Sequence, residues 1–196
     1  LRVDTSSFLQ ARFGWHFILL AVSRLSPEKN LGMAFEVLAR VRKQFPDTGL
    51  VIAGSGSEEN KLKSLTKKLG LDGAVEFVGW QDNLISFYKT ANLFIQTSLF
   101  EGYGLSLIEA GLNGLPVITT NVGIAQELES GRDAYIYEVG EAEAMARGVG
   151  DLITNNFKRE NLRLNLKNTL EQKLISKEEY LRRLSESWAN TARKIS

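Results

Sequence analysis

Short runs of apolar residues alternate along this chain with longer segments in which apolar residues recur every three or four positions. A continuous apolar run of four to six residues is typical of a strand that is buried on both faces of a sheet. Such runs predict six strands, at residues 17–22, 50–53, 75–78, 92–96, 116–119 and 134–137.

The segments between these runs predict helices. Residues 31–45 carry apolar side chains at helical spacing, and Ser57 and Gly70 are expected to cap the start and the end of the next helix. Strands that alternate with helices indicate an α/β fold, namely a Rossmann-like parallel six-stranded sheet with helices on both faces. The remaining helices are predicted at 82–91, 105–113, 141–153, 157–174 and 177–195.

The same pattern divides the chain into three parts. Residues 1–14 show no clear period and are interpreted as a linker, residues 15–176 as the Rossmann-like domain, and residues 177–196 as a closing helix. Because the chain begins with Leu1 rather than Met, we expect it to be part of a longer protein.

Composition excludes several classes of site. The 196 residues include no Cys and a single His, which argues against disulfides and against a zinc site. No apolar stretch of 18 residues predicts a membrane-spanning helix. The net charge is +1, but residues 157–196 hold ten Lys or Arg and five Glu. We favour a solvated helical face for this basic end, with an anionic membrane surface or an acidic partner as the alternative.

Polar and glycine-bearing loops follow most of the predicted strands. In a parallel sheet these loops share one edge, where ligands bind beyond the carboxyl ends of the strands. The loop between the fourth strand and its helix is rich in glycine, and Gly102 and Gly104 would let the backbone approach a ligand closely. The start of the following helix favours an anion.

Charged residues at this edge suggest the chemistry. Arg24 and Lys29 follow the first strand, and two cations there suit a diphosphate. Glu101 and Glu109 frame the glycine-rich turn, and Glu109 lies in an apolar helix, where a buried carboxylate needs a partner. The two acids could also form an acid–base pair of the hydrolase kind, although their spacing does not fix their separation.

Other candidate sites are rejected. The segment 54–59 begins like a dinucleotide fingerprint, but Glu59 stands where the third Gly or Ala is required, so NAD binding is not expected. Trp80 is interpreted as a core or domain-contact residue.

Three motifs, in this order, resemble the carboxy-terminal half of the family 4 retaining glycosyltransferases. They are Arg24-x4-Lys29, the segment Phe77-Val78-Gly79, and Glu101-x7-Glu109 within a Gly-Tyr-Gly-Leu turn. The resemblance spans nearly the whole chain, with residues 1–14 similar to the inter-domain linker. It implies the GT-B architecture, in which two Rossmann-like domains enclose the active site.

The resemblance also implies roles for these residues. Arg24 and Lys29 would bind the donor diphosphate and stabilise it as a leaving group, and Glu109 would hold the ribose hydroxyls. The backbone near Val78 would border the base. The donor sugar and a phosphate would be held by Glu101 and by the backbone of Gly102, Tyr103, Gly104 and Leu105. Glu101, Arg24 and Lys29 are thus the expected catalytic residues, with no metal and no cofactor besides the nucleotide-diphosphate sugar, of UDP or GDP type.

The expected function is transfer of a sugar, with retention, to a hydroxyl acceptor in polysaccharide, lipopolysaccharide or glycolipid synthesis. The resemblance implies a cytoplasmic protein whose partners are the nucleotide sugar, a sugar or lipid-linked acceptor and the amino-terminal GT-B domain, but no nucleic acid. Peripheral contact with the inner face of a membrane stays open. Two other functions stay open as well: a GT-B epimerase acting on a UDP-sugar, and a non-catalytic nucleotide-sugar-binding module.

One segment departs from the family pattern. The family often has Gly-Gly-x-Pro-Glu after the fifth strand, whereas residues 123–127 read Gly-Ile-Ala-Gln-Glu. This leaves the shape of that loop, and with it the donor preference, open.

Overall fold

The six predicted strands form one sheet in the computed structural model, which describes residues 14–174. The linker predicted at 1–14, apart from Gly14, and the closing helix predicted at 177–196 lie outside the described residues. The strands are β1 (Phe17–Val22), β2 (Thr48–Ala53), β3 (Val75–Gly79), β4 (Leu93–Gln96), β5 (Val117–Thr120) and β6 (Tyr135–Tyr137).

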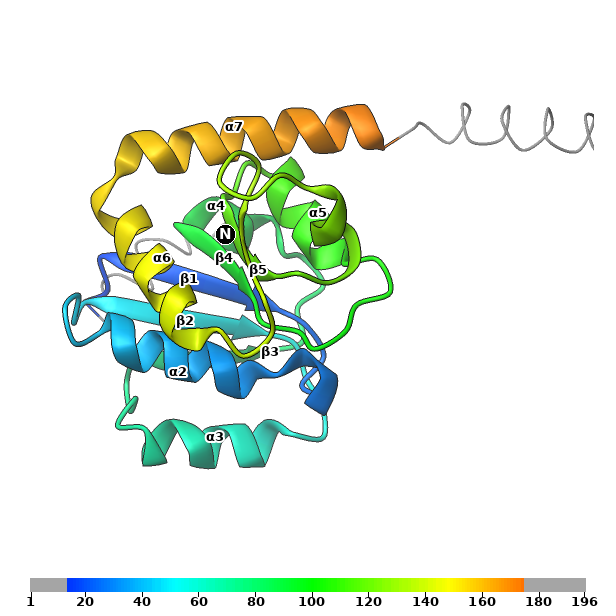
Figure 1. The fold of residues 1–196 in the computed structure, drawn as a ribbon. Coiled ribbons are helices and arrows are strands. Elements are labelled where there is room, and N and C mark those ends of the chain that lie inside the picture. Colours follow the sequence, from blue (N-terminus) through cyan, green and yellow to red (C-terminus); the bar gives the residue numbers. More distant parts are fainter. Residues whose placement is uncertain (1–13, 175–196) are drawn as a thin grey trace, which may run out of the picture.

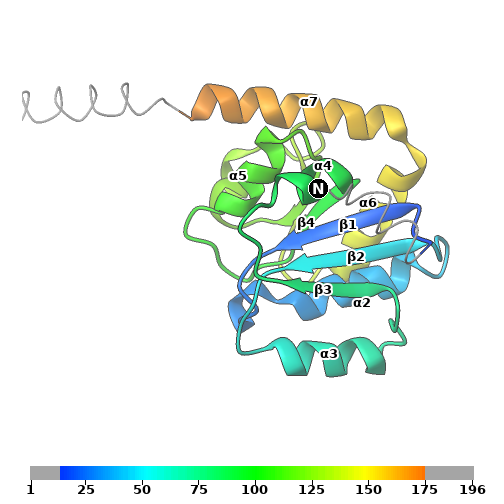
Figure 2. The ribbon, with the colours of Figure 1, turned by 180° about the vertical axis from the view of Figure 1, so that it is seen from behind.

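The strand order across the described sheet is β3-β2-β1-β4-β5-β6, and each neighbouring pair is parallel. The order reverses between β1 and β4, and in such sheets a ligand site is expected beyond the carboxyl ends of the strands at this point. Figures 1 and 2 show the arrowheads of β1 and β2 directed toward the side where the loop between β4 and α5 projects.

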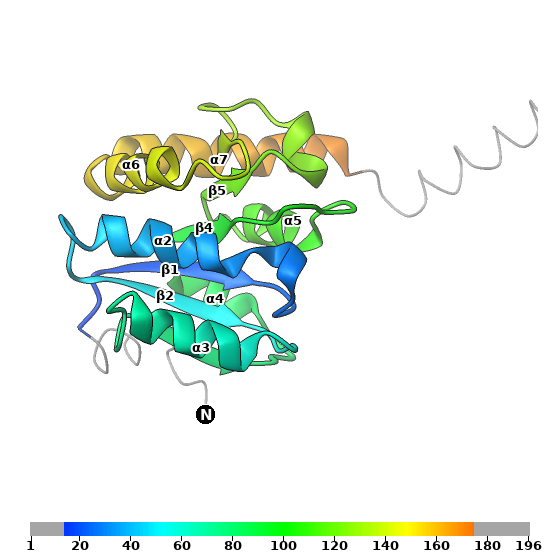
Figure 3. The same cartoon turned by 60° about the horizontal axis from the view of Figure 1, so that its bottom comes forward.

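Helices cover both faces of the sheet, as the sequence predicts. The buried side chains of α2 and α6 pack on one face, and those of α4 and α5 on the other. Figure 3 shows α2 and α3 running alongside β1 and β2. The described helices are α2 (Leu31–Val41), α3 (Glu59–Lys68), α4 (Ile85–Thr90), α5 (Leu105–Leu112), α6 (Ala142–Thr154) and α7 (Asn156–Lys173), with 3-10 turns η1 (Pro27–Lys29) and η2 (Gly123–Glu127).

The alternation of side chains along β1 explains the two cores. Leu19 and Ala21 point into the core beneath α2 and α6, while Ile18 and Leu20 point into the core beneath α4 and α5. All four are at most 2% exposed. A strand buried on both faces must be apolar at every position, which is why the pattern of β1 is continuous rather than alternating.

Several element ends differ from the sequence predictions, and three of these differences concern how a helix begins or ends. Helix α2 ends at Val41 rather than at residue 45, and Pro46 disfavours helical geometry in Phe45, the residue just before it. Ser57 does not cap α3; Glu58 occupies that position without a side-chain capping bond. Helix α4 begins at Ile85 rather than at residue 82. At this start the Asn83 side chain accepts a hydrogen bond of 3.0 Å from the Ile85 N–H.

Candidate functional site

The four charged residues that the sequence pattern singles out all lie along the wall of one cleft. Its volume is about 560 Å³, and Arg24, Lys29, Glu101 and Glu109 all contribute to its wall. They come from the loop after β1, the loop after β4 and helix α5, which meet at the carboxyl ends of the strands beside the β1/β4 switch point. The sequence therefore predicted correctly that these side chains share one site.

Lys29 and Glu101 form a direct ion pair in this cleft. The Lys29 ammonium Nζ lies 2.9 Å from each carboxylate oxygen of Glu101, and the two side chains are only 15% and 11% exposed. The Ser98 hydroxyl donates a further hydrogen bond of 2.7 Å to Glu101 Oε1. Removing such a pair from water is costly, so good geometry and extra hydrogen bonds are needed to hold it.

Hydrogen bonds to backbone carbonyl groups hold together the two loops that carry this pair. The Leu99 N–H donates to the Glu28 carbonyl at 2.8 Å, and the Thr97 hydroxyl donates to the Asn30 carbonyl at 3.0 Å. Asn30 itself joins η1 to α2 in the left-handed region, with φ of 47°. Asn tolerates this conformation better than most residues. The loops after β1 and β4 are thus held together at several points.

Arg24 is held more loosely than Lys29. Its side chain is 74% exposed, and Nη2 lies 3.1 Å from Glu28 Oε1. The Ser26 hydroxyl holds the pKa of the Glu28 carboxyl below its usual value, and the nearby Arg24 guanidinium also lowers it. Because an exposed ion pair of this kind contributes little stability, the guanidinium can exchange Glu28 for an anionic ligand at low cost.

Glu109 faces the cleft and has a partner that the sequence did not reveal. It is exposed at the cleft rather than buried in the core. Its Oε2 accepts a hydrogen bond of 2.9 Å from the hydroxyl of Tyr88, a residue of α4 that is only 3% exposed. Burial raises the pKa of the Tyr88 phenol far above its usual value, and the bond to Glu109 raises it further. Tyr88 therefore remains a hydrogen-bond donor.

The glycine-rich turn places the start of α5 at the cleft. Gly104 is the residue before the helix and adopts φ of 94°, a conformation that favours glycine. It lines the cleft together with Tyr103 and Leu105. The first N–H groups of an α-helix have no partner inside the helix, so they can bind an anion. Gly102 does not line the cleft, and a Cβ there would meet nothing within 4 Å.

Val78, whose backbone was predicted to border the base, lies near the cleft lining but not in it. Val78 does not line the cleft, whereas Trp80, Gln81 and Leu84 do. The Gln81 side chain donates to the Val78 carbonyl at 2.6 Å, which turns the chain at this point. Trp80 is 72% exposed, so of its two predicted places, the core or a domain contact, the core is excluded.

Gly54 and Gly56 shape the loop that carries Arg24. A Cβ on Gly54 would lie 1.9 Å from the carbonyl oxygen of Ser23, and one on Gly56 would lie 2.3 Å from that of Leu25. The Leu25 N–H donates to the Ser55 carbonyl at 2.9 Å. These glycines are needed because two backbone segments touch, a role that the sequence pattern did not indicate.

The segment 123–127, which departs from the family pattern, forms the turn η2. Gly123 has φ of 58°, and a Cβ there would lie 2.7 Å from the Tyr103 carbonyl oxygen. The Ile124 N–H donates to that same carbonyl at 2.8 Å. The glycine that this segment keeps therefore lets it pack closely against the glycine-rich turn. Glu127 points elsewhere, with Oε2 lying 3.2 Å from Lys173 Nζ.

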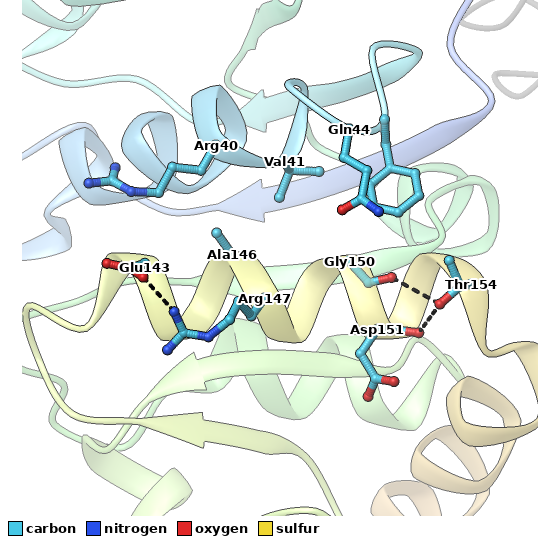
Figure 4. Close-up of a pocket in the computed structure, with 10 residues that line it drawn as sticks. Arg40, Val41, Gln44, Glu143, Ala146, Arg147, Gly150, Asp151 and Thr154 are labelled. Carbon is cyan, nitrogen blue, oxygen red and sulfur yellow. Dashed lines mark hydrogen bonds and ion pairs between the residues drawn. The ribbon is translucent and has the colours of Figure 1, made fainter.

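A second hollow lies between α2 and α6, with a volume of about 580 Å³ (Figure 4). We call it the α2/α6 groove. Its charged side chains have local partners: Arg147 Nη1 lies 2.6 Å from Glu143 Oε1, and Asp151 Oδ2 lies 2.8 Å from Lys158 Nζ. Figure 4 shows the Asp151 carboxylate directed away from α2. The groove thus resembles the cleft in volume but not in chemistry.

Within residues 14–174, no group of three or more His, Asp or Glu side chains is placed to hold a metal ion. None of the helices described there combines the length and the apolar character that crossing a membrane requires.

Comparison with known proteins identifies the family. The family described as glycosyl transferases group 1 matches residues 7–169. An uncharacterized glycosyltransferase of Haemophilus influenzae is 30% identical over 172 residues, which are 87% of this chain and 47% of that protein. The chain thus spans about half the length of this relative.

Solved structures share the fold. S. aureus TarM, crystallised with UDP among its ligands, superposes with a TM-score of 0.80 at 26% identity, over 89% of this chain and 36% of that one. The C-terminal domain of the group 1 protein LpcC from Francisella tularensis gives a TM-score of 0.77 at 21% identity, over 88% of this chain and 93% of that domain. The chain therefore belongs to the glycosyl transferases group 1 family, with the Rossmann-like fold of the carboxy-terminal half of a GT-B glycosyltransferase.

Proposed function

We propose that this chain is the donor-binding half of a retaining glycosyltransferase that moves a sugar from a nucleoside-diphosphate sugar to a hydroxyl acceptor. The observation that carries the proposal is the convergence of Arg24, Lys29, Glu101 and Glu109 on one cleft beside the start of α5. Cations and helix N–H groups suit a diphosphate, and carboxylates suit the hydroxyls of ribose and sugar.

The two cations would act on the leaving group. Transfer breaks the bond between the anomeric carbon and the diphosphate oxygen, so negative charge grows on that oxygen in the transition state. Arg24 offers a planar fork of donors, while Lys29 keeps one N–H beyond the two directed at Glu101. Donors fixed before the reaction stabilise such charge most effectively. With retention, the acceptor attacks from the face that the diphosphate leaves, and its proton passes to the departing diphosphate.

Glu101 would position and stabilise rather than form a covalent bond. Its carboxylate is engaged by the Lys29 ammonium and the Ser98 hydroxyl, and these hydrogen bonds occupy lone pairs that a nucleophile would need. It keeps about one lone pair, on Oε2, for a sugar hydroxyl, because a carboxylate accepts about four hydrogen bonds and three are already made. Its negative charge would also favour the positive charge that develops at the anomeric carbon.

The acceptor site would lie in a domain beyond this chain. Large apolar side chains stand exposed around the cleft, with Trp80 at 72%, Phe100 at 69% and Leu105 at 67%. Exposed apolar surface of this kind marks an interaction site. Since the chain spans about half of its Haemophilus influenzae relative, we propose that the other half covers this surface and completes the cleft. The chain alone would then bind nucleotide but barely turn over.

Calorimetric titration of residues 1–196 with UDP and GDP tests donor binding. UDP is the first candidate, since it is present in the TarM complex. We expect one of the two to bind, and Arg24→Ala to weaken that binding several-fold through loss of a charge-assisted contact. Binding of neither nucleotide would contradict the proposal, as would unchanged affinity in both Arg24→Ala and Lys29→Ala.

Activity is tested with the full-length protein and a panel of nucleotide sugars. Nucleotide release that requires an acceptor, with the anomeric configuration of the donor retained in the product, supports a retaining transferase. Isomerisation of the nucleotide sugar itself, in the absence of acceptor, indicates the epimerase instead. Binding without any turnover indicates the non-catalytic module.

A further inference from the structure

Tyr88 links helix α4 to the cleft in a way that the proposed roles do not use. Its ring is buried beneath α4, with its centroid 6.4 Å from that of Phe94 on β4. Its hydroxyl donates a hydrogen bond of 2.9 Å to Oε2 of Glu109, a residue that lines the cleft. The tyrosine thus has an apolar body fixed in the core and a polar tip directed at a cleft residue.

The side chains of Glu109 and Tyr88 differ in how freely they can move. Glu109 is exposed and its side chain has three rotatable bonds, so nothing in its own packing holds the carboxylate in one place. Tyr88 is only 3% exposed, and its close-packed ring cannot follow the carboxylate. The hydrogen bond therefore selects the carboxylate position, since the buried partner is the fixed one.

The bond leaves the second carboxylate oxygen available. Tyr88 engages Oε2, and each carboxylate oxygen has two lone pairs. Oε1 can therefore accept from a ligand hydroxyl while Tyr88 holds the other oxygen. Burial raises the pKa of the phenol, so the hydroxyl stays protonated and remains a donor to Glu109 Oε2.

We propose that Tyr88 is a positioning residue that presents the Glu109 carboxylate to the vicinal hydroxyls of the donor ribose. This rests on the proposed function, in which Glu109 contacts the ribose. It adds that recognition of the ribose diol, and hence preference for a ribonucleotide over its deoxy analogue, depends on a hydroxyl that does not itself touch the ligand.

Tyr88→Phe tests the proposal because it removes the hydroxyl and keeps the buried ring. We expect the Kd for the nucleoside diphosphate that binds to rise about five-fold, as loss of one ordinary hydrogen bond predicts. For the corresponding 2′,3′-dideoxynucleoside diphosphate we expect no change beyond two-fold, because that ligand has no diol to misplace. Equal weakening for both ligands, or no weakening for either, would overturn the proposal.

Tyr135→Phe is the matched control. The Tyr135 hydroxyl also donates to a carboxylate, at 2.5 Å from Asp151 Oδ2, but on the side of the molecule near the α2/α6 groove. We expect it to leave the affinity for both ligands unchanged. A ribose-dependent loss in this control as large as in Tyr88→Phe would show that any lost tyrosine hydroxyl has the effect, which contradicts the assignment.

A third measurement needs no nucleotide. In ligand-free crystal structures, we expect the Glu109 carboxylate to hold one position in the wild type and to shift or divide between positions in Tyr88→Phe. An unchanged carboxylate would overturn the positioning role even if nucleotide binds. A wild-type chain that binds no nucleoside diphosphate would instead contradict the proposed function, while the crystals would still decide the role of Tyr88.

Discussion

The cleft and the α2/α6 groove have nearly equal volumes, about 560 Å³ and 580 Å³, yet they are built in opposite ways. In the cleft, Lys29 pairs with a carboxylate 72 residues away along the chain. In the groove, Arg147 pairs with Glu143 one helical turn earlier. Helical geometry alone produces the second kind of pair, whereas the first requires the whole sheet to bring two loops together.

Exposure sharpens the contrast. The side chains of the Lys29–Glu101 pair are 15% and 11% exposed, against 68% and 77% for Arg147 and Glu143. Burying two charges is unfavourable unless they are well paired, and it is weak evidence for stability. A buried pair assembled from distant loops therefore points to a functional site better than the size of a hollow does.

Lys29→Met should have the largest effect. It leaves the Glu101 carboxylate buried without its cation, and we expect the free energy of unfolding to fall by about 3 kcal/mol. We also expect nucleotide affinity to fall at least ten-fold, because a charge-assisted contact is lost. Urea unfolding and calorimetric titration measure the two effects.

Arg147→Met is the control for Lys29→Met, since it removes a cation of similar length from the groove. We expect its effect on affinity to stay within two-fold and its effect on stability to stay under about 0.5 kcal/mol. If the two variants behaved alike, the distinction between cleft and groove would be lost.

Gly56→Ala should have an intermediate effect. Its Cβ would stand 2.3 Å from the Leu25 carbonyl oxygen, so the loop that carries Arg24 must move. We expect a several-fold loss of nucleotide affinity and a loss of about 1–3 kcal/mol of stability, as overpacking produces. Thermal unfolding and titration check this.

Gly32→Ala is the matched control within α2. A Cβ there meets only the Leu65 Cδ2 atom at 3.4 Å, so we expect unchanged affinity and a gain of up to about 1 kcal/mol from helix propensity. A normal affinity in Gly56→Ala would mean that the shape of the Arg24 loop does not matter for binding.

Asp151→Asn should have the smallest effect, and one that depends on pH. The hydrogen bond from Lys158, and then that from Tyr135, hold the pKa of the Asp151 carboxyl below its usual 3.8. The stability that the ionised Asp151 carboxylate adds to the folded state is thus present above pH 3.8 and is lost as the pH falls through the lowered pKa. We expect the variant to be destabilised by less than about 1 kcal/mol at pH 7, because this pair is partly exposed.

Thermal unfolding at pH 7 and pH 3 measures this difference. The difference in unfolding temperature between the wild type and Asp151→Asn should become smaller at the lower pH. The nucleotide affinity at pH 7 should stay unchanged. A gap that widens on acidification would contradict the assigned direction of the pKa shift.

Much of the fold could be predicted because its strands and helices follow from local patterns of apolar and polar residues. The continuous apolar run of β1 was placed at its observed bounds, and the rule for parallel sheets brought Arg24 and Glu109 to the same edge. The end of α2 was missed because the apolar spacing continues to Phe45, although Pro46 had already restricted the backbone.

The parts of the site that were missed depend on contacts between distant segments. Gly56 matters because a second loop touches its backbone, and Tyr88 matters because its hydroxyl reaches a residue on another helix. Neither contact has a sequence spacing that could reveal it. The resemblance predicts that the backbone near Val78 borders the base, but the turn after β3 brings Trp80 and Gln81 to the cleft instead.

The Lys29–Glu101 pair also determines what an incoming anion experiences at a distance. The two opposite charges lie 2.9 Å apart and largely cancel beyond their neighbourhood. Arg24 is also paired, with Glu28, but its side chain is exposed, so its guanidinium can turn toward a diphosphate that approaches from solution. Association rate and its sensitivity to ionic strength would thus depend chiefly on Arg24, while Lys29 would govern how long the bound diphosphate stays.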